Sequence, residues 1–123
     1  RGGESALLAA VAARHWQTAA ALAEEGADLE ARGPEGRTAL LAAAKARELQ
    51  AVRLLAECRA DLEARGGRER LTALLAASLE GRLELVQLLL EARADPEARD
   101  REARSCLLAA ASARQWPAAA LLL

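Results

Sequence analysis

Few side chains in this sequence could perform catalysis or bind a metal ion. His15 is the only histidine, and Cys58 and Cys106 lie far from it and from each other along the chain. A catalytic zinc needs three protein ligands, and an activated nucleophile needs an adjacent base with a supporting group. The glycines within 33–36 and 66–67 follow no predicted strand, so they do not indicate a phosphate-binding loop. We therefore expect no enzymatic activity, no metal and no cofactor.

The composition predicts a helical protein. The 123 residues include 34 Ala and 24 Leu, and there is no Phe, Tyr, Met or Ile. Ala and Leu are strong helix formers, whereas the residues that favour strands are almost absent. The fold class expected from these residues is all-α.

Net charge and hydropathy limit the classes of partner and the cellular location that we expect. The net charge of −1 provides no bulk attraction for nucleic acid or anionic lipid, so neither is an expected partner. No apolar run approaches the roughly 18 residues needed for a transmembrane segment. Two cysteines do not form a disulfide framework, and free thiols fit an intracellular location, with the compartment left open.

One short phrase occurs four times in the chain. Its copies begin at Ser5, Thr38, Thr72 and Ser105, at spacings of 33, 34 and 33 residues. A second phrase, whose first copy reads A-D-L-E-A-R, occupies residues 27–32, 60–65 and 94–99. Self-similarity at this period indicates units that bury their apolar faces by stacking on one another. We expect a single array with repeats at about 1–32, 33–65, 66–99 and 100–123, the last one incomplete.

The second unit shows how each repeat is built. Residues 33–37 contain glycine and proline and predict a turn. Thr38 is placed to cap the following helix, because its hydroxyl can accept a hydrogen bond from a free backbone N–H. Apolar residues then recur at helical spacing, and a second helix is expected at about 49–58.

These motifs resemble the ankyrin repeat family. Its pattern is a β-turn, a short helix that opens T-P-L-H-x-A-A, a turn, a second helix that ends L-L-L, and the exit G-A-D-V-N-A. Residues 38–44 match the opening, 81–90 match the turn and second helix, and 26–31 match the exit. The resemblance extends over the whole chain and implies an α-solenoid of stacked helix-turn-helix units joined by β-turn fingers. It also gives His15 a structural place in the turn between two helices.

The sequence departs from the family's pattern at two glycine positions. The glycine between the helices is kept only as Gly81, and the exit glycine only as Gly26. Arginine replaces them elsewhere, at Arg14, Arg47, Arg114, Arg59 and Arg93. If these positions keep a left-handed backbone, each arginine costs about 1–2 kcal/mol, so we expect a lower stability than that of a consensus array. The family's histidine of the first helix is leucine in every unit, and its exit asparagine is glutamate.

The resemblance also implies a binding surface. Ankyrin proteins bind partners with their fingers and the exposed side of their first helices, which form a concave face. Carried over by motif position, the candidate contact residues are Pro34, Glu35, Arg37, Lys45, Ala46, Arg65, Arg68, Glu69, Arg70, Leu79, Glu80, Arg101, Glu102 and Arg104. We expect Leu71 and Leu79 to be exposed, and the third unit to have one extra residue in its finger.

The chemistry of the partner follows from the arginines. Half of the 16 arginines lie in the three fingers, when Arg32, Arg65 and Arg99 at the finger bases are counted with them. Arginine forks pair well with carboxylates, which favours an acidic protein segment as partner. The alternatives are a solvated rim whose charges compensate one another, and a codon bias toward arginine. Trp16 and Trp116 begin the second helices of the first and fourth units, where each either anchors a partner or covers the outer face of an end unit.

Together these features predict a non-catalytic scaffold that binds a protein partner, as part of a longer chain or of a large complex whose subunits are its partners. The alternative is a regulatory repeat segment attached to a catalytic domain outside this sequence. Nucleic-acid binding would show itself as an affinity that falls steeply with salt.

Overall fold

The computed structural model describes residues 6–123, apart from the side chain of Pro34. Ser5, at which the first copy of the repeated phrase begins, lies outside these residues. Regular secondary structure in the described part of the chain is helical, with one isolated bridge between Gly66 and Leu71, so the all-α prediction is confirmed. The chain divides into two compact units, of which the first ends at Asp61 and the second begins at Leu62.

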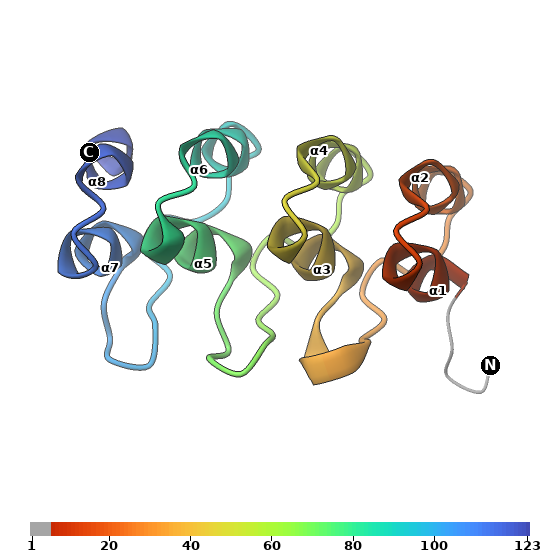
Figure 1. The fold of residues 1–123 in the computed structure, drawn as a ribbon, viewed down its shortest axis with the longest axis horizontal. Helices are drawn as coiled ribbons and strands as arrows, with labels where there is room; N and C mark the ends of the chain where they lie inside the picture. Colours follow the sequence, from red (N-terminus) through yellow and green to blue (C-terminus); the bar gives the residue numbers. More distant parts are fainter. Residues whose placement is uncertain (1–5) are drawn as a thin grey trace. The chain divides into compact units, whose positions relative to one another are not determined.

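The first unit holds two helix pairs. They are α1 (Ala6–Ala12) with α2 (Trp16–Glu24) and α3 (Ala39–Lys45) with α4 (Leu49–Glu57), and a short 3-10 turn, η1 (Pro34–Gly36), precedes α3. Helix α1 packs on α3, and α2 packs on α4, so the first helices form one layer and the second helices another (Figure 1).

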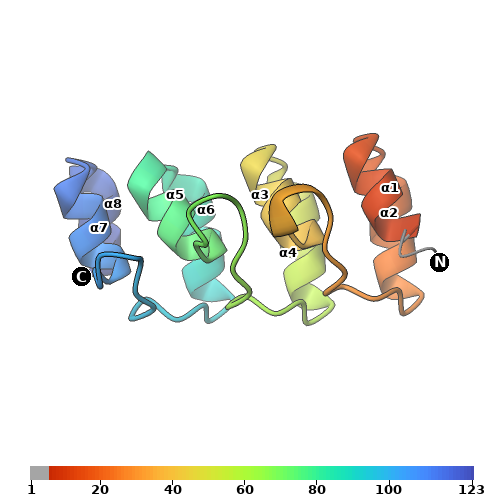
Figure 2. The ribbon, with the colours of Figure 1, turned by 90° about the horizontal axis from the view of Figure 1, so that it is seen from below.

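The second unit repeats this arrangement. Its pairs are α5 (Ala73–Glu80) with α6 (Leu83–Glu91) and α7 (Cys106–Ser112) with α8 (Trp116–Leu122). Helix α5 packs on α7 and α6 on α8, and the loop that precedes each first helix is seen in front of the helices in Figure 2. Leu74, Leu75, Val86 and Leu89 are almost completely buried, and burying each such side chain contributes about 1.5–3 kcal/mol.

Threonine side chains begin the two central first helices. The Oγ1 atom of Thr38 accepts a hydrogen bond from the Leu41 N–H at 3.3 Å, and that of Thr72 accepts one from the Leu75 N–H at 3.2 Å. Each bond satisfies a backbone donor that the helix leaves without a partner. The cap predicted at Thr38 is therefore present.

Arginine occupies a left-handed backbone at the positions that glycine holds elsewhere in the chain. Gly81 has a φ of 70°, and its counterparts Arg14, Arg47 and Arg114 have φ values of 61°, 65° and 62°. Gly26 has a φ of 97°, and its counterparts Arg59 and Arg93 have values of 72° and 76°. Because these arginines have a left-handed backbone, each of them costs about 1–2 kcal/mol of stability.

Glutamates of the exit phrase link consecutive repeats. The Glu30 carboxylate accepts a hydrogen bond from the Asp61 N–H at 2.8 Å, and the Glu63 carboxylate accepts one from the Asp95 N–H at 2.8 Å. The partners are 31 and 32 residues apart, one repeat along the chain. Glutamate, which stands in place of the family's asparagine, therefore connects the backbones of neighbouring repeats.

The arginine at position 47 should destabilise the protein through its backbone alone. Arg47→Gly removes the left-handed penalty of about 1–2 kcal/mol and adds about 0.5–1 kcal/mol of backbone entropy cost. We expect the free energy of unfolding to rise by about 0.5–1 kcal/mol, measured by urea titration followed by circular dichroism. Arg53→Gly, which makes the same change at an exposed site within α4, should lower it by about 1 kcal/mol. A loss of stability in both variants would contradict the strain argument.

Candidate functional site

Three finger segments, defined as residues 33–37, 66–71 and 100–104, are closed by backbone hydrogen bonds. The Gly33 N–H donates to the Arg37 carbonyl at 2.9 Å, and the Asp100 N–H donates to the Arg104 carbonyl at 2.9 Å. In the middle finger, Gly66 and Leu71 exchange two hydrogen bonds of 3.2 Å, and the loop between them is one residue longer than the loops of the other two fingers. The extra residue predicted for this finger is therefore accommodated within its closed loop.

One arginine at the base of each finger holds the finger backbone. The guanidinium groups of Arg32, Arg65 and Arg99 donate to the carbonyl oxygens of Gly36, Arg70 and Ala103, at 2.6, 3.2 and 2.8 Å. These arginines end the three copies of the exit phrase, so the same contact recurs in each repeat junction. Arg65, a candidate contact residue, is thus engaged inside its own finger.

The first unit contains an apolar groove of about 480 Å³. Helix α1 contributes Leu8, Val11 and Ala12, and helix α3 with the turn that follows it contributes Ala42, Lys45 and Ala46. Three further side chains line it: Arg14, Trp16 and Arg37. Trp16, Arg37, Lys45 and Ala46 are the candidate residues that the structure brings together here.

The charged residues that line this groove are all cationic, and Arg14 and Arg37 form ion pairs with glutamates of the same unit. Arg14 pairs with Glu48 at 3.5 Å, and Arg37 pairs with Glu35 at 2.5 Å. The Arg14 and Glu35 side chains are exposed, and ion pairs of this kind contribute about 0–1 kcal/mol. These two ion pairs therefore contribute little to the stability of the fold.

A second groove, of about 340 Å³, lies in the second unit beside two fingers. It is lined by Glu69, Leu71, Leu79, Asp100, Arg101, Glu102 and Arg104. Five of these are candidate contact residues, and they come from the middle finger, from α5 and from the third finger. The prediction that Leu71 and Leu79 are exposed was wrong, because both are half-buried in the wall of this groove.

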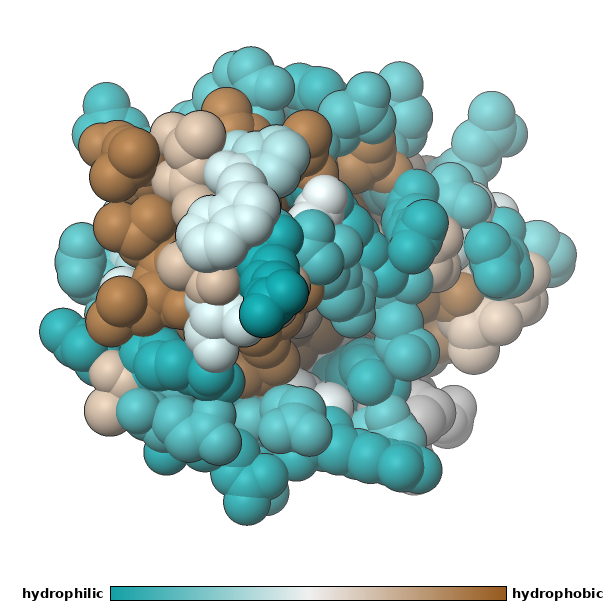
Figure 3. Space-filling view, turned by 60° about the vertical axis from the view of Figure 1, so that its left-hand side comes forward, coloured by the Kyte–Doolittle hydropathy of each residue, from teal (hydrophilic) through white to brown (hydrophobic). Residues whose placement is uncertain are grey.

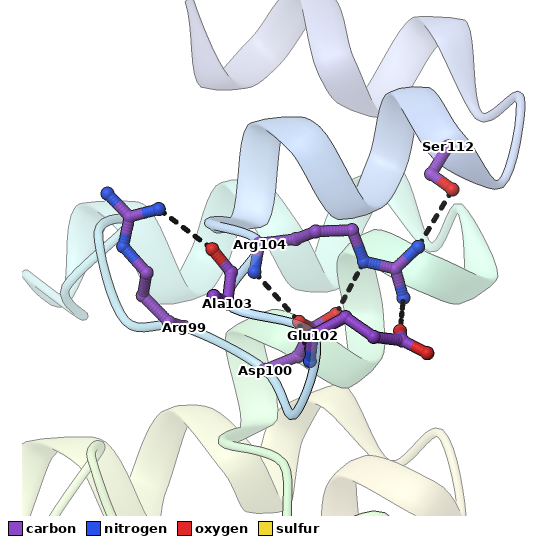
Figure 4. Close-up of polar contacts among 6 residues, drawn as sticks. All are labelled: Arg99, Asp100, Glu102, Ala103, Arg104 and Ser112. Carbon is purple, nitrogen blue, oxygen red and sulfur yellow. Dashed lines mark hydrogen bonds and ion pairs between the residues drawn. The ribbon is translucent and has the colours of Figure 1, made fainter.

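Arg104 is held by a network of hydrogen bonds within the second unit (Figure 4). Its guanidinium donates to the Asp100 carboxylate at 2.9 Å, to the Glu102 carboxylate at 2.5 Å and to the Ser112 hydroxyl at 2.8 Å. Asp100 also accepts from the backbone N–H groups of Glu102 and Arg104 at 2.9 Å. The network therefore fixes the third finger and ties it to the C-terminal end of α7.

Asp100 is the buried centre of this network. Burial raises the pKa of its carboxyl, but the hydrogen bonds from Arg104 and Glu102 and the charge of Arg104 outweigh burial, so the pKa lies below its ordinary value. Asp100 is consequently ionised in the folded protein at neutral pH. Sequence reasoning placed it in the finger but missed its role, for which the spacing of Asp100 and Arg104 was the available signal.

The remaining candidates lie outside both grooves. Arg68 and Arg70 are exposed on the middle finger, and Glu80 is exposed at the end of α5, where it pairs with Arg82 at 2.7 Å. Trp116 is exposed on α8, and Glu35 is at the tip of the first finger, paired with Arg37. The side chain of Pro34, also a candidate, lies outside the described atoms.

The groove residues that sequence reasoning missed are mostly small or apolar. The first helices that carry Leu8, Val11, Ala12 and Ala42 were predicted. Which of their side chains line a groove depends on the distance between stacked repeats, which the sequence does not give. Arg14 was recognised as a turn residue and not as part of a groove.

The residues whose side chains could take part in catalysis or metal binding are dispersed. His15 is exposed just before α2, Cys58 is half-buried and Cys106 is buried, and both cysteines are free thiols. Within residues 6–123, no three His, Cys, Asp or Glu side chains are close enough to hold a metal ion. In the same residues, no helix has the length and apolar character required to cross a bilayer.

Comparison with known families supports the repeat assignment. A family model described as ankyrin repeats (3 copies) matches residues 1–66, and a second model, described as ankyrin repeat, matches residues 69–101. The first match covers more than half of the chain. A comparison with curated proteins returned no match.

The Asp100 network should make stability depend on acid pH. Asp100→Asn removes the charge and the acceptor for the Arg104 side chain, so we expect a loss of about 1–3 kcal/mol at pH 7. Because the folded pKa is lowered, this stabilisation is present above the ordinary carboxyl value of 3.8 and is lost as the pH falls through the folded pKa. Urea titrations at pH 7, 4 and 2 should therefore show the difference between wild type and variant shrinking with acid.

A matched control distinguishes the contribution of this network to stability from that of an exposed charge. Glu102→Gln removes only a mostly exposed partner of Arg104, and it should cost less than about 1 kcal/mol. A pH-independent difference between Asp100→Asn and wild type would contradict the assignment.

The two thiols should differ in reactivity. Burial raises the pKa of the Cys106 thiol to about 11, a hydrogen bond with Ser78 lowers it, and the charges of Glu63, Asp95 and Glu97 raise it further. At pH 8, about one in a thousand Cys106 side chains is then a thiolate, and the side chain is completely buried. A pulse of iodoacetamide followed by mass spectrometry should modify half-buried Cys58 first, and Cys106 only after urea is added. Equal modification of both in the folded protein would contradict the burial of Cys106.

Proposed function

Because the chain belongs to the ankyrin-repeat family, we propose that it is a non-catalytic interaction module that binds a protein partner through its fingers and the two grooves beside them. Ankyrin repeats are generally protein–protein interaction modules. The observation that carries the proposal is the pair of grooves, since each is built from finger and first-helix residues and is left unfilled by the protein's own side chains.

The first groove suits a segment that combines apolar and acidic side chains. Its apolar wall can bury leucine-like or aromatic groups, at about 25 cal/mol for each Å² removed from water. Arg14, Arg37 and Lys45 surround that wall with positive charge. Carboxylates that replace the weak internal ion pairs would fix the orientation of the bound segment.

The second groove has a different balance of charge. It is lined by two arginines and three acidic residues, and Arg104 is committed to its internal network. Its half-buried leucines, Leu71 and Leu79, supply the apolar surface, while Arg68 and Arg70 extend the middle finger beside it. We assign Arg65 and Arg104 to positioning the fingers, and Arg68, Arg70 and Arg101 to contact with the partner.

Charge reversal at the two surfaces tests this proposal. Two variants, Lys45→Glu and the double variant Arg68→Glu with Arg70→Glu, change residues of the first groove and of the middle finger. Partners should first be identified by crosslinking and mass spectrometry in extract of the source organism, and then measured with purified components. We expect at least one variant to weaken binding by on the order of tenfold or more, with unchanged helicity.

Arg53→Glu is the matched control, because it reverses the charge of an exposed arginine on α4 that lines neither groove. It should leave affinity unchanged. If the groove and finger variants bind as tightly as the control does, the contact surface lies elsewhere on the molecule.

A further inference from the structure

The first and third fingers have the same length and the same closing contacts. In each, the N–H of the first residue donates to the carbonyl of the last residue at 2.9 Å. The arginine that precedes each finger donates to the carbonyl of the fourth residue. The last residues, Arg37 and Arg104, are therefore equivalent, and so are the first residues, Gly33 and Asp100.

Arg104 is surrounded by acceptors of its own repeat. Its Nε–H group donates to the Asp100 carboxylate, and its other N–H groups donate to Glu102 and Ser112. Asp100 also accepts the backbone N–H of Arg104 at 2.9 Å. The third finger thus supplies the carboxylate that satisfies both the side chain and the backbone of its arginine.

This arrangement of charges lies at the surface of the molecule. The Glu102 side chain is 73% exposed although it pairs with Arg104. Figure 3 shows hydrophilic side chains along the lower edge of the molecule, where the finger loops lie in Figure 1. A carboxylate at the equivalent position of the first finger could therefore come from outside the chain.

The first finger lacks two of the three acceptors. Glycine stands at position 33, where the third finger has its aspartate, and α3 ends with Lys45, where the equivalent helix ends with a serine. Arg37 keeps the ion pair with Glu35, which involves one terminal nitrogen of the guanidinium. The first finger therefore combines an arginine and a lysine beside a position at which the chain itself provides no carboxylate.

This position adjoins the first groove. Arg37 and Lys45 both line the groove, and none of the described residues that line it is acidic. A Cβ atom added at Gly33 would lie 3.4 Å from Cδ2 of Leu8, which belongs to the apolar wall of the same groove. A carboxylate bound beside Arg37 would thus lie next to apolar surface on which its neighbours in a bound segment can pack.

On the basis of the proposed function, we infer that the first groove selects a partner segment by one Asp or Glu side chain, whose carboxylate binds Arg37 as Asp100 binds Arg104. The Arg37 guanidinium and backbone N–H donate to this carboxylate, and Lys45 adds positive charge. Charge-assisted hydrogen bonds of this kind are about twice as strong as neutral ones. A large apolar residue close to the acidic one in the partner packs against Leu8.

Gly33→Asp tests this inference, because it builds the carboxylate into the chain. The variant copies the first residue of the third finger, so Arg37 gains an internal partner and the urea midpoint of unfolding should rise, with unchanged circular dichroism. The internal carboxylate competes with that of a ligand, so affinity should fall on the order of tenfold or more. Damage to the fold would instead lower stability and affinity together.

The probe is a library of random peptides displayed on phage and selected on the wild-type protein. Peptides that bind the Lys45→Glu variant more weakly are kept, because they contact the first groove. We expect these peptides to contain Asp or Glu close to Leu or an aromatic residue, and to bind Gly33→Asp on the order of tenfold more weakly. Changing the acidic residue of a peptide to its amide should weaken binding to the wild type as much, and should have little effect on binding to Gly33→Asp.

Gly33→Ala is the matched control, since it adds a Cβ atom at the same position without a carboxylate and should bind as the wild type does. Arg37→Leu reproduces the residue of the middle finger, Leu71, and should lose the same affinity. It decides the outcome if Gly33→Asp alters the circular dichroism.

Two results would overturn the inference and leave the proposed function standing. One is that peptides sensitive to Lys45→Glu bind Gly33→Asp and Arg37→Leu as tightly as the wild type. The other is that these peptides contain no acidic residue. A selection that yields no peptide sensitive to Lys45→Glu would overturn the inference together with the assignment of the first groove as a contact surface.

Discussion

The packing of one repeat on the next is the contact on which the rest of the structure depends. The α-helices of residues 6–123 have only seven to nine residues. Isolated helices shorter than about 12–15 residues are marginal in water, so none of these would persist alone. Completely or almost completely buried alanines such as Ala43, Ala77 and Ala109 lie on the first helices, where a small side chain allows the next helix to approach closely. Helix formation and repeat stacking are therefore one process.

This packing also explains how the chain tolerates strained turns. Within the described residues, eight non-glycine residues have a positive φ, and five of them are arginines at two recurrent glycine positions. The penalty at each is about 1–2 kcal/mol, which is comparable with what burial of one leucine contributes. Leu74, Leu75 and Leu89 provide such burial in the second unit, and the Glu63 link adds a hydrogen bond to it. A repeat can thus keep arginine in a turn as long as its neighbours remain stacked.

The sequence predicted the elements well and the surface less well, for a physical reason. The helix at 49–57, the Thr38 cap and the left-handed arginines follow from local rules, because each depends on a few adjacent residues. The half-burial of Leu79, the grooves and the reach of Glu30 to the Asp61 backbone depend on the distance between repeats. The repeat period reveals that such contacts exist, and the atoms that make them are determined only when the stacking geometry is known.

The finger arginines show why counting charges is a poor guide to binding. Arg32, Arg65 and Arg99 recur at one position of the repeat and donate to finger carbonyls. Arg37 and Arg104 pair with carboxylates of their own fingers. A planar guanidinium with five donors can bond a carbonyl while it spans a loop, which an ammonium group does less well. A codon bias toward arginine does not by itself account for the recurrence of this contact, so at least three of these arginines serve the fold. The proposed function therefore assigns the electrostatic part of partner recognition in the second unit mainly to the arginines that are exposed on the middle finger, Arg68 and Arg70.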